Sequence, residues 1–173
     1  DETSPLAEQA DQVIPLHVGA EKAVAATKSY LATSSALLQL VAAWSGNSQL
    51  QDAVISLPEL LECAIELPAQ LTAQSLQGVE HLVVLGRGPG YAISREIALK
   101  LKEVCGIHAE AFSSAEFLYG PVTLVKDQFA IVDVSIADEA NAAHQAQIAE
   151  VRSRGARILH LHHADLLSNP RVL

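Results

Sequence analysis

The sequence is short of several features, and each shortage excludes a class of protein. Positive charge is scarce: 11 lysines and arginines stand against 20 aspartates and glutamates, which gives a formal net charge of −9. Proteins that bind nucleic acids generally need a basic surface, so we expect no nucleic-acid partner. No apolar run reaches the roughly 18 residues of a membrane span, so we expect no membrane partner. A small anion remains compatible with this charge, because backbone N–H groups, hydroxyls and one lysine can hold a phosphate.

Cysteine and methionine are also scarce. Cys63 and Cys105 are the two cysteines, and they do not have the spacing of a metal site. Cys105 is predicted on the buried side of a helix, so we interpret both as reduced core thiols of a cytoplasmic protein rather than as a disulfide. The chain starts at Asp1 and contains no methionine. We therefore expect a fragment of a longer protein.

Alanine, leucine and valine are abundant. Half of the residues are hydrophobic and only 4% are aromatic, which suits helices packed on a parallel sheet. From Gly78 onward, strand patterns alternate with helix patterns, which predicts an α/β fold with a parallel sheet flanked by helices. Strands are expected at 82–85, 108–112, 129–136 and 157–162, and helices at 91–105, 115–119 and 139–154. The helix at 91–105 is expected to bury Ile93, Ile97, Leu101 and Val104 and to end at Gly106.

The first 77 residues predict a different organisation. A short helix is expected at 4–10, with Ser4 as its N-cap, followed by a short strand at 12–16. A long helix is expected at 21–44, ended by Gly46, with most of its apolar residues buried. The segment 49–77 has helical patterning that Pro58 and Pro68 interrupt. We therefore expect the end of one domain at 1–46, a helical connector at 47–77 and a second domain at 78–173.

Lys100 and Glu103 are the first candidates for chemistry. They are three residues apart on the predicted helix and share the shoulder of its apolar stripe with Glu96. There, a carboxylate could move a proton between adjacent carbons of a sugar, and a lysine could neutralise a phosphate or a developing oxyanion. The alternative is an ordinary surface ion pair, worth about 0.2–0.5 kcal/mol.

Two other motifs carry weaker signals. The turn from Gly86 to Gly90 could bring backbone close to a ligand, but its spacing is not the GxGxxG of dinucleotide sites, and a tight strand-to-helix turn explains it equally well. The HLHH sequence at 160–163 places His160 and His162 on one face of a strand. We interpret these histidines as ordinary strand-end residues rather than as half of a metal site.

Two long segments resemble a known family. IALKLKEVCGIHAEAFSSAEFLYGP is similar to the second sugar isomerase (SIS) domain of glucosamine-6-phosphate synthases and of related glucosamine-6-phosphate deaminases. SPLAEQADQVIPLHVGAEKAVAATKSYLAT resembles the end of the first SIS domain of the same proteins. The resemblance implies a three-layer SIS fold, with parts of two tandem SIS domains in this chain and a homodimer in solution.

The resemblance also implies roles for particular residues. The glutamate of the Lys-Leu-Lys-Glu sequence is the catalytic base in the family, and here it is Glu103; the first lysine of that sequence is Lys100. The synthases carry a histidine immediately before the Gly-Pro, where this chain has Tyr119. The Val-Ala-x-Thr-Lys stretch lines the sugar-phosphate pocket in the family, which places four residues near substrate: Val24, Ala25, Ala26 and Thr27.

These matches imply an amino-sugar-phosphate isomerase or deaminase. The substrate would be a hexosamine 6-phosphate, converted by aldose–ketose isomerisation with release of ammonia and without a metal or organic cofactor. Tyr119 in place of the histidine, and Ala26 where the synthases commonly have a hydroxyl residue, favour the deaminase over the synthase. The isomerase domain of a glutamine–fructose-6-phosphate aminotransferase remains an alternative. So do a sugar-phosphate-sensing SIS module and a catalytically inactive structural half.

Overall fold

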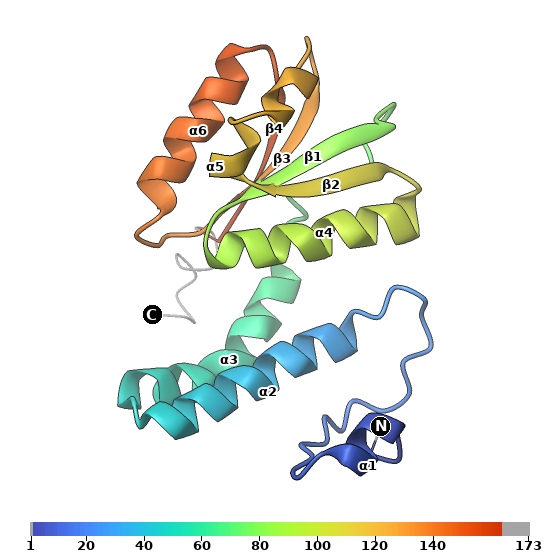
Figure 1. Cartoon of the computed structure of the whole chain (residues 1–173), viewed down its shortest axis with the longest axis vertical. Coiled ribbons are helices and arrows are strands. Elements are labelled where there is room, and N and C mark those ends of the chain that lie inside the picture. The colour runs from blue at the N-terminus through green and yellow to red at the C-terminus, as the bar shows by residue number, and fades with distance from the viewer. Residues whose placement is uncertain (1, 164–173) are drawn as a thin grey trace. The chain divides into compact units, whose positions relative to one another are not determined.

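The computed structural model describes residues 2–163. The chain divides into two compact units between Glu62 and Cys63. The second unit contains the sheet. Its four strands, β1 to β4, are all parallel and lie in the order β2-β1-β3-β4 (Figure 1). They span His81–Gly86, His108–Ser113, Ala130–Ser135 and Arg157–His162. This arrangement confirms the predicted α/β fold and each of the predicted strands in the second unit.

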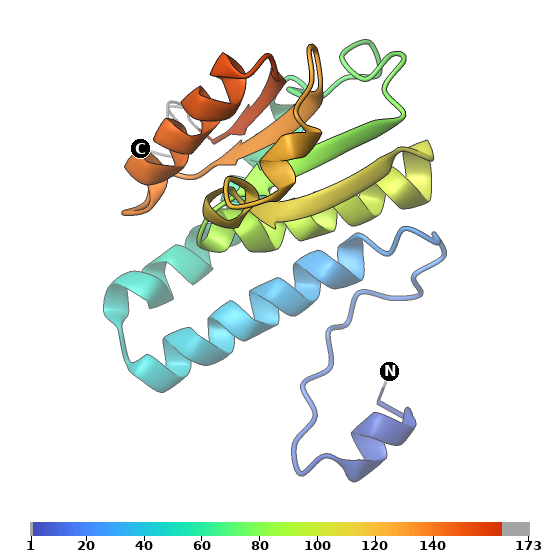
Figure 2. The same ribbon diagram turned by 45° about the horizontal axis from the view of Figure 1, so that its top comes forward.

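Helices cover both faces of this sheet. Helix α4 (Pro89–Cys105) lies on one face, and α5 (Ser114–Phe117) and α6 (Asn141–Ser153) lie on the other, as Figures 1 and 2 show. A short 3-10 helix, η1, spans Pro121–Leu124. The central strands β1 and β3 are buried on both sides. Because successive side chains alternate between faces, Val84 and Val132 pack in the core under α4, while Leu85 and Ile131 pack in the core under α5 and α6.

The face that α4 turns toward the sheet differs from the predicted one. The buried residues of α4 are Gly90, Ser94, Ala98 and Leu101. The prediction was right for Leu101 and wrong for Ile93 and Val104, since Val104 is 67% exposed and Ile93 is 41% exposed. Small side chains let the helix approach the strands closely, and the larger apolar residues are displaced to its flanks. Cys105 is exposed as well, so its prediction as a core thiol was wrong, whereas Cys63 is buried; both thiols are free.

The first unit begins with a short helix and an irregular segment. Helix α1 (Pro5–Gln9) has Ser4 as its N-cap, as predicted: the Ser4 hydroxyl accepts a hydrogen bond from the Ala7 N–H at 3.2 Å. The predicted strand at 12–16 is not formed. Within the described residues no other strand pairs with this segment, and a strand is stable only with a neighbour for its backbone groups.

Helix α2 (Lys28–Ser45) begins seven residues after the predicted start. The Glu21 carboxylate accepts hydrogen bonds from the backbone N–H and the hydroxyl of Ser29, so it stabilises the first turn of the helix from outside it. Gly46 ends the helix in the left-handed conformation, as predicted. The prediction that most apolar residues of this helix are buried was wrong. The buried residue of α2 is Ala42. The apolar residues expected in the core are exposed: Val24, Leu31, Leu37, Leu38 and Val41.

Helix α3 (Ser48–Glu66) runs through Pro58 without a break, so the predicted interruption at this residue was wrong. Pro58 removes one helical hydrogen bond, but the bonds on either side keep the helix continuous. Pro68 follows the end of the helix. In the described part of the chain, no helix is both long and apolar enough to cross a membrane.

Candidate functional site

Lys100 and Glu103 are in direct contact on α4. The Lys100 Nζ lies 2.7 Å from Glu103 Oε2 and 3.3 Å from Glu96 Oε1, so one ammonium group bridges two carboxylates. About a quarter of each of the three side chains is exposed to solvent. The pKa of Lys100 is raised above its usual value, chiefly by its hydrogen bond to Glu103, against a smaller opposing effect of desolvation and with additional support from Glu96. Lys100 is therefore a fixed cation at neutral pH.

This trio can perform acid–base chemistry on a small polar substrate. Glu103 can accept a proton through one carboxylate oxygen while Lys100 holds the other, and Lys100 can stabilise negative charge that develops on a substrate oxygen. An apolar cavity of about 340 Å³ lies near the carboxyl ends of β3 and β4. From α4 it is lined by Ile93 and Ile97, whereas the trio follows in the second half of the helix and does not line it. Ligands of open α/β sheets bind at this end of the strands.

The glycines of the β1–α4 turn are explained by packing. A Cβ atom on Gly86 would lie 2.4 Å from both the Gly90 carbonyl oxygen and the Ser94 Oγ, so only glycine allows α4 to start this close to β1. A Cβ on Gly90 would lie 3.1 Å from the Val134 carbonyl oxygen. Gly88 has a φ of 53°, which favours glycine. These contacts favour the tight-turn interpretation of this segment over the ligand-binding one.

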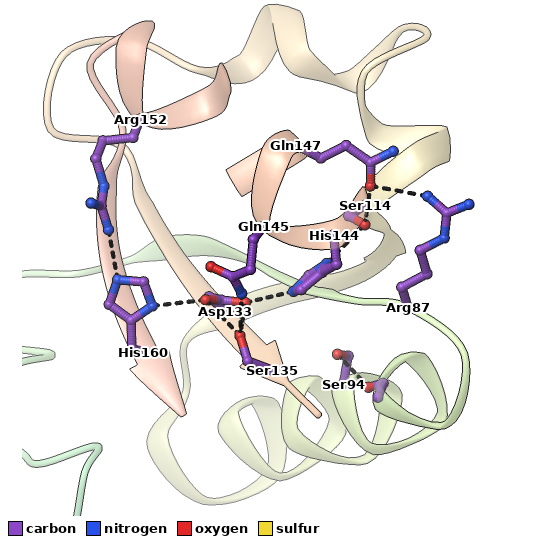
Figure 3. Close-up of polar contacts among 11 residues, drawn as sticks. Arg87, Ser94, Ser114, Asp133, Ser135, His144, Gln145, Gln147, Arg152 and His160 are labelled. Carbon is purple, nitrogen blue, oxygen red and sulfur yellow. Dashed lines mark hydrogen bonds and ion pairs between the residues drawn. The ribbon is translucent and has the colours of Figure 1, made fainter. Parts of the chain in front are cut away.

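A buried polar network lies on the opposite face of the sheet (Figure 3). Its centre is Asp133, a fully buried residue of β3. The Asp133 carboxylate receives hydrogen bonds from His144 Nε2 of α6 at 2.6 Å, from His160 Nδ1 of β4 at 2.7 Å and from the Ser135 hydroxyl at 3.0 Å. Burial raises the pKa of Asp133, but these hydrogen bonds, led by that of His144, outweigh burial and lower the pKa below its usual value. Asp133 is therefore an ionised carboxylate that only accepts hydrogen bonds.

The network continues from His144 to two loops at the same end of the sheet. The second ring nitrogen of His144, Nδ1, lies 2.9 Å from the hydroxyl of Ser114, the first residue of α5. This hydroxyl also donates to the Gln147 side-chain oxygen, which in turn accepts a hydrogen bond from Arg87 of the β1–α4 turn. The sequence analysis did not identify this network. One signal was present, because Asp133 is the single charged residue in an apolar strand.

Two of the HLHH histidines make hydrogen bonds within the domain. His160 donates to Asp133, and its Nε2 lies 2.6 Å from an Arg152 nitrogen, so both ring nitrogens are occupied. His162 exchanges two backbone hydrogen bonds with the side chain of Gln70. Among residues 2–163, no three His, Cys, Asp or Glu side chains are grouped so that they could hold a metal ion. This arrangement agrees with their interpretation as ordinary strand-end residues.

The other predicted site residues lie away from the Lys100 trio or in the first unit. Tyr119 follows α5 in the second unit and is 92% exposed. The stretch from Val24 to Thr27 lies in the first unit, in the loop that leads into α2. Val24 is 91% exposed, and the Thr27 hydroxyl donates to the Ala25 carbonyl at 3.0 Å. Of the predicted residues in the second unit, the structure brings together Lys100 and Glu103.

The parallel sheet, with helices on both faces, defines a three-layer α/β domain. The SIS-domain family matches residues 75–166 of the chain. The chain belongs to the SIS-domain family.

Comparison with individual proteins agrees with this family. The chain is 34% identical over 163 residues to the glutamine–fructose-6-phosphate aminotransferase (isomerizing) of Idiomarina loihiensis, covering 88% of this chain and 27% of that protein. It therefore spans about a quarter of the length of this curated relative.

Two solved structures are also similar. The first is that of a candidate phosphosugar isomerase from Silicibacter pomeroyi, with a TM-score of 0.81 and 37% identity over 91% of this chain and 48% of that one. The second is the glucosamine-6-phosphate deaminase of Thermotoga maritima, with a TM-score of 0.73 and 26% identity over 93% of this chain and 50% of that one.

Proposed function

We propose that this chain is part of a phosphosugar isomerase that acts on a hexosamine 6-phosphate. The observation that supports this proposal is the trio on α4, in which Lys100 bridges Glu103 and Glu96. The family membership and the names of the similar proteins supply the substrate class. The chain is then expected to work as a homodimer in the cytoplasm, and the exposed side chain of Tyr119 is available to a neighbouring subunit.

In the proposed reaction, Glu103 moves a proton between C1 and C2 of the open-chain sugar. It removes the C2 proton of the amino aldose and returns a proton to C1, which gives a ketimine. Water then hydrolyses the ketimine to a ketose phosphate and ammonia. Lys100 stabilises the negative charge that develops on the oxygen at C1. The aldehyde itself acidifies the neighbouring C–H bond, so this chemistry needs no metal or organic cofactor.

The family resemblance implies further residues in contact with substrate. Val24, Ala25, Ala26 and Thr27 would contact the sugar phosphate, and Tyr119 would assist ring opening. The domain organisation we propose accordingly keeps the end of one SIS domain at 1–46, a connector at 47–77 and a second SIS domain at 78–173.

A second candidate is the reaction in the opposite direction, in which the isomerisation is coupled to the addition of nitrogen to a ketose phosphate instead of its release as ammonia. Curated relatives at 34% identity are glutamine–fructose-6-phosphate aminotransferases. Their names favour the hypothesis that this chain is the isomerase domain of such an enzyme. Tyr119, which stands where the resemblance implies a histidine in the synthases, favours ammonia release instead. Incubation with glucosamine 6-phosphate, followed by measurement of ammonia and ketose phosphate, separates the two candidates.

Replacement of Glu103 tests the shared chemical step. The full-length protein is incubated with glucosamine 6-phosphate in D2O, and deuterium incorporation at C1 of the product is followed by NMR. Glu103→Gln keeps the shape of the side chain and removes the base, so we expect a loss of about 10²–10⁴-fold in turnover. Glu96→Gln is the matched control, because it alters the other carboxylate bound to Lys100, and we expect turnover within about tenfold of the wild type. Equal turnover of Glu103→Gln and wild type would contradict the proposal.

A further inference from the structure

The Asp133 network joins the carboxyl ends of all four strands. Asp133 belongs to β3 and His160 to β4, while Ser114 directly follows β2 and Arg87 directly follows β1. The hydrogen bonds among them pass through His144 and Gln147 of α6 (Figure 3). Loops at this end of an open α/β sheet are the ones that hold ligands. A network that fixes them relative to one another can therefore control the geometry of a site.

The arrangement of Ser114, His144 and Asp133 has the composition of a hydrolase triad, but it cannot act as one. Ser114 is 1% exposed and His144 is 2% exposed. A substrate carbonyl cannot reach a hydroxyl that is buried between α5 and α6. The Ser114 hydroxyl also donates its single proton to an acceptor other than the histidine, the Gln147 oxygen. The three residues must therefore stabilise the fold or fix the position of a neighbouring segment.

The segment that the network holds is the α5 turn, which leads to Tyr119. Two contacts fix this turn. Ser114 at its start binds His144 and Gln147, and Phe117 at its end is fully buried and packs against Phe112 with a ring-centroid distance of 5.6 Å. The Tyr119 N–H donates to the Glu116 carbonyl at 3.0 Å, so the backbone of Tyr119 is tied to the turn. The apolar contact is not directional, whereas the hydrogen bonds of Ser114 define one orientation of the turn.

We propose that the chain of hydrogen bonds from Asp133 through His144 to Ser114 positions the α5 turn, and that this positioning holds Tyr119 in the geometry its catalytic role requires. The part that concerns catalysis rests on the function proposed above, while the part that concerns the turn does not. Asp133 fixes the ring of His144, because an ionised carboxylate can only accept and His144 must therefore present its Nε2–H to it. The Nδ1 of the same ring then faces Ser114. His144 and Ser114 are positioning residues and touch no substrate.

Two hydroxyl deletions at opposite ends of the network provide the test. Ser114→Ala removes the bond between His144 and α5. Ser135→Ala is the matched control, because it removes a hydroxyl bonded to the same Asp133 carboxylate but not to α5. Amide hydrogen exchange of the full-length protein is measured in both variants and in the wild type. In Ser114→Ala we expect the Tyr119 amide to exchange at least tenfold faster, with the amides of β1 and β3 unchanged. In Ser135→Ala we expect the Tyr119 amide to exchange as in the wild type.

Turnover of glucosamine 6-phosphate supplies the second readout. If the turn positions Tyr119 for bond making, Ser114→Ala lowers kcat at least fivefold and leaves KM within about threefold. Unchanged exchange of Tyr119 in Ser114→Ala would overturn the proposal, and so would faster exchange spread evenly over the sheet, which indicates general destabilisation. Absence of turnover in every variant, including the wild type, would refute the proposed function alone, because hydrogen exchange still decides whether the network positions the turn. Faster exchange with unchanged kcat would refute the catalytic part.

Discussion

Replacement of Gly86 by alanine tests how closely α4 must approach β1. The added Cβ would lie 2.4 Å from the Gly90 carbonyl oxygen and from the Ser94 Oγ. Two of the three nearest atoms belong to the backbone of Gly90, which cannot rotate away as a side chain can. The start of α4 must therefore move away from the strand. Overpacking of a well-packed core usually costs about 1–3 kcal/mol, and two contacts this short place Gly86→Ala at the upper end, at about 3 kcal/mol.

Gly106→Ala separates this packing cost from the cost of backbone strain. Gly106 ends α4 with a φ of 66°, and a Cβ there would have no neighbour within 4 Å. Alanine at this position therefore causes no steric clash, and its only cost is the left-handed backbone conformation, about 1–2 kcal/mol. Urea unfolding of both variants, followed by circular dichroism, gives the two free energies. We expect Gly86→Ala to lose more stability than Gly106→Ala. A Gly86→Ala variant within about 0.5 kcal/mol of the wild type would refute the packing explanation of this turn.

Two further predictions concern the charge on Asp133 and the two thiols. Because the folded-state pKa of Asp133 is lowered, its contribution to stability is fully present above the unfolded value of about 3.9 and is lost as pH falls through the folded value. Asp133→Asn removes this ionisation, so the free energy of unfolding should fall less steeply in the variant than in the wild type as pH is lowered below about 4, and parallel curves would contradict the lowered pKa. Cys105 is exposed and Cys63 is buried, so a thiol reagent such as Ellman's reagent should modify one thiol quickly in the native protein and the second only after unfolding. Cys105→Ser should abolish the fast phase, and its persistence would contradict the assigned exposure.

The sheet could be predicted from the sequence because its signals are local. The central strands β1 and β3 are short runs of mainly apolar residues. Strand patterns alternate with helical patterns along the second unit, and this alternation implies a parallel sheet. Gly106 and Gly46 were identified as helix ends because glycine readily adopts the left-handed conformation there. The contact between Lys100 and Glu103 followed from helical geometry, which brings residues three apart together.

The features that could not be predicted from the sequence depend on contacts between segments that are distant along the chain. The buried face of α4 was misjudged because hydrophobicity favours Ile93 and Val104. Close packing against Gly86 instead requires a small residue at Ser94, and small Ala98 packs in the core under the helix. The partners of Asp133 could not be predicted, since nothing local indicates that His144 and His160 converge on it from different elements. The start of α2 was misplaced because Glu21 stabilises its first turn from outside the helix, which periodicity does not reveal.

The Asp133 network limits how this edge of the domain can change during evolution or by design. Loops at the carboxyl ends of parallel strands are usually exchanged one at a time when a fold acquires a new specificity. Here Arg87 and Ser114 follow β1 and β2, His160 belongs to β4, and all three take part in one polar network centred on buried residues. A loop grafted without its matching polar residue would leave a buried donor or acceptor unpaired, at a cost of about 1–3 kcal/mol. Transplants of the α5 turn from a relative should therefore succeed only when the residues equivalent to His144 and Gln147 are transferred with it.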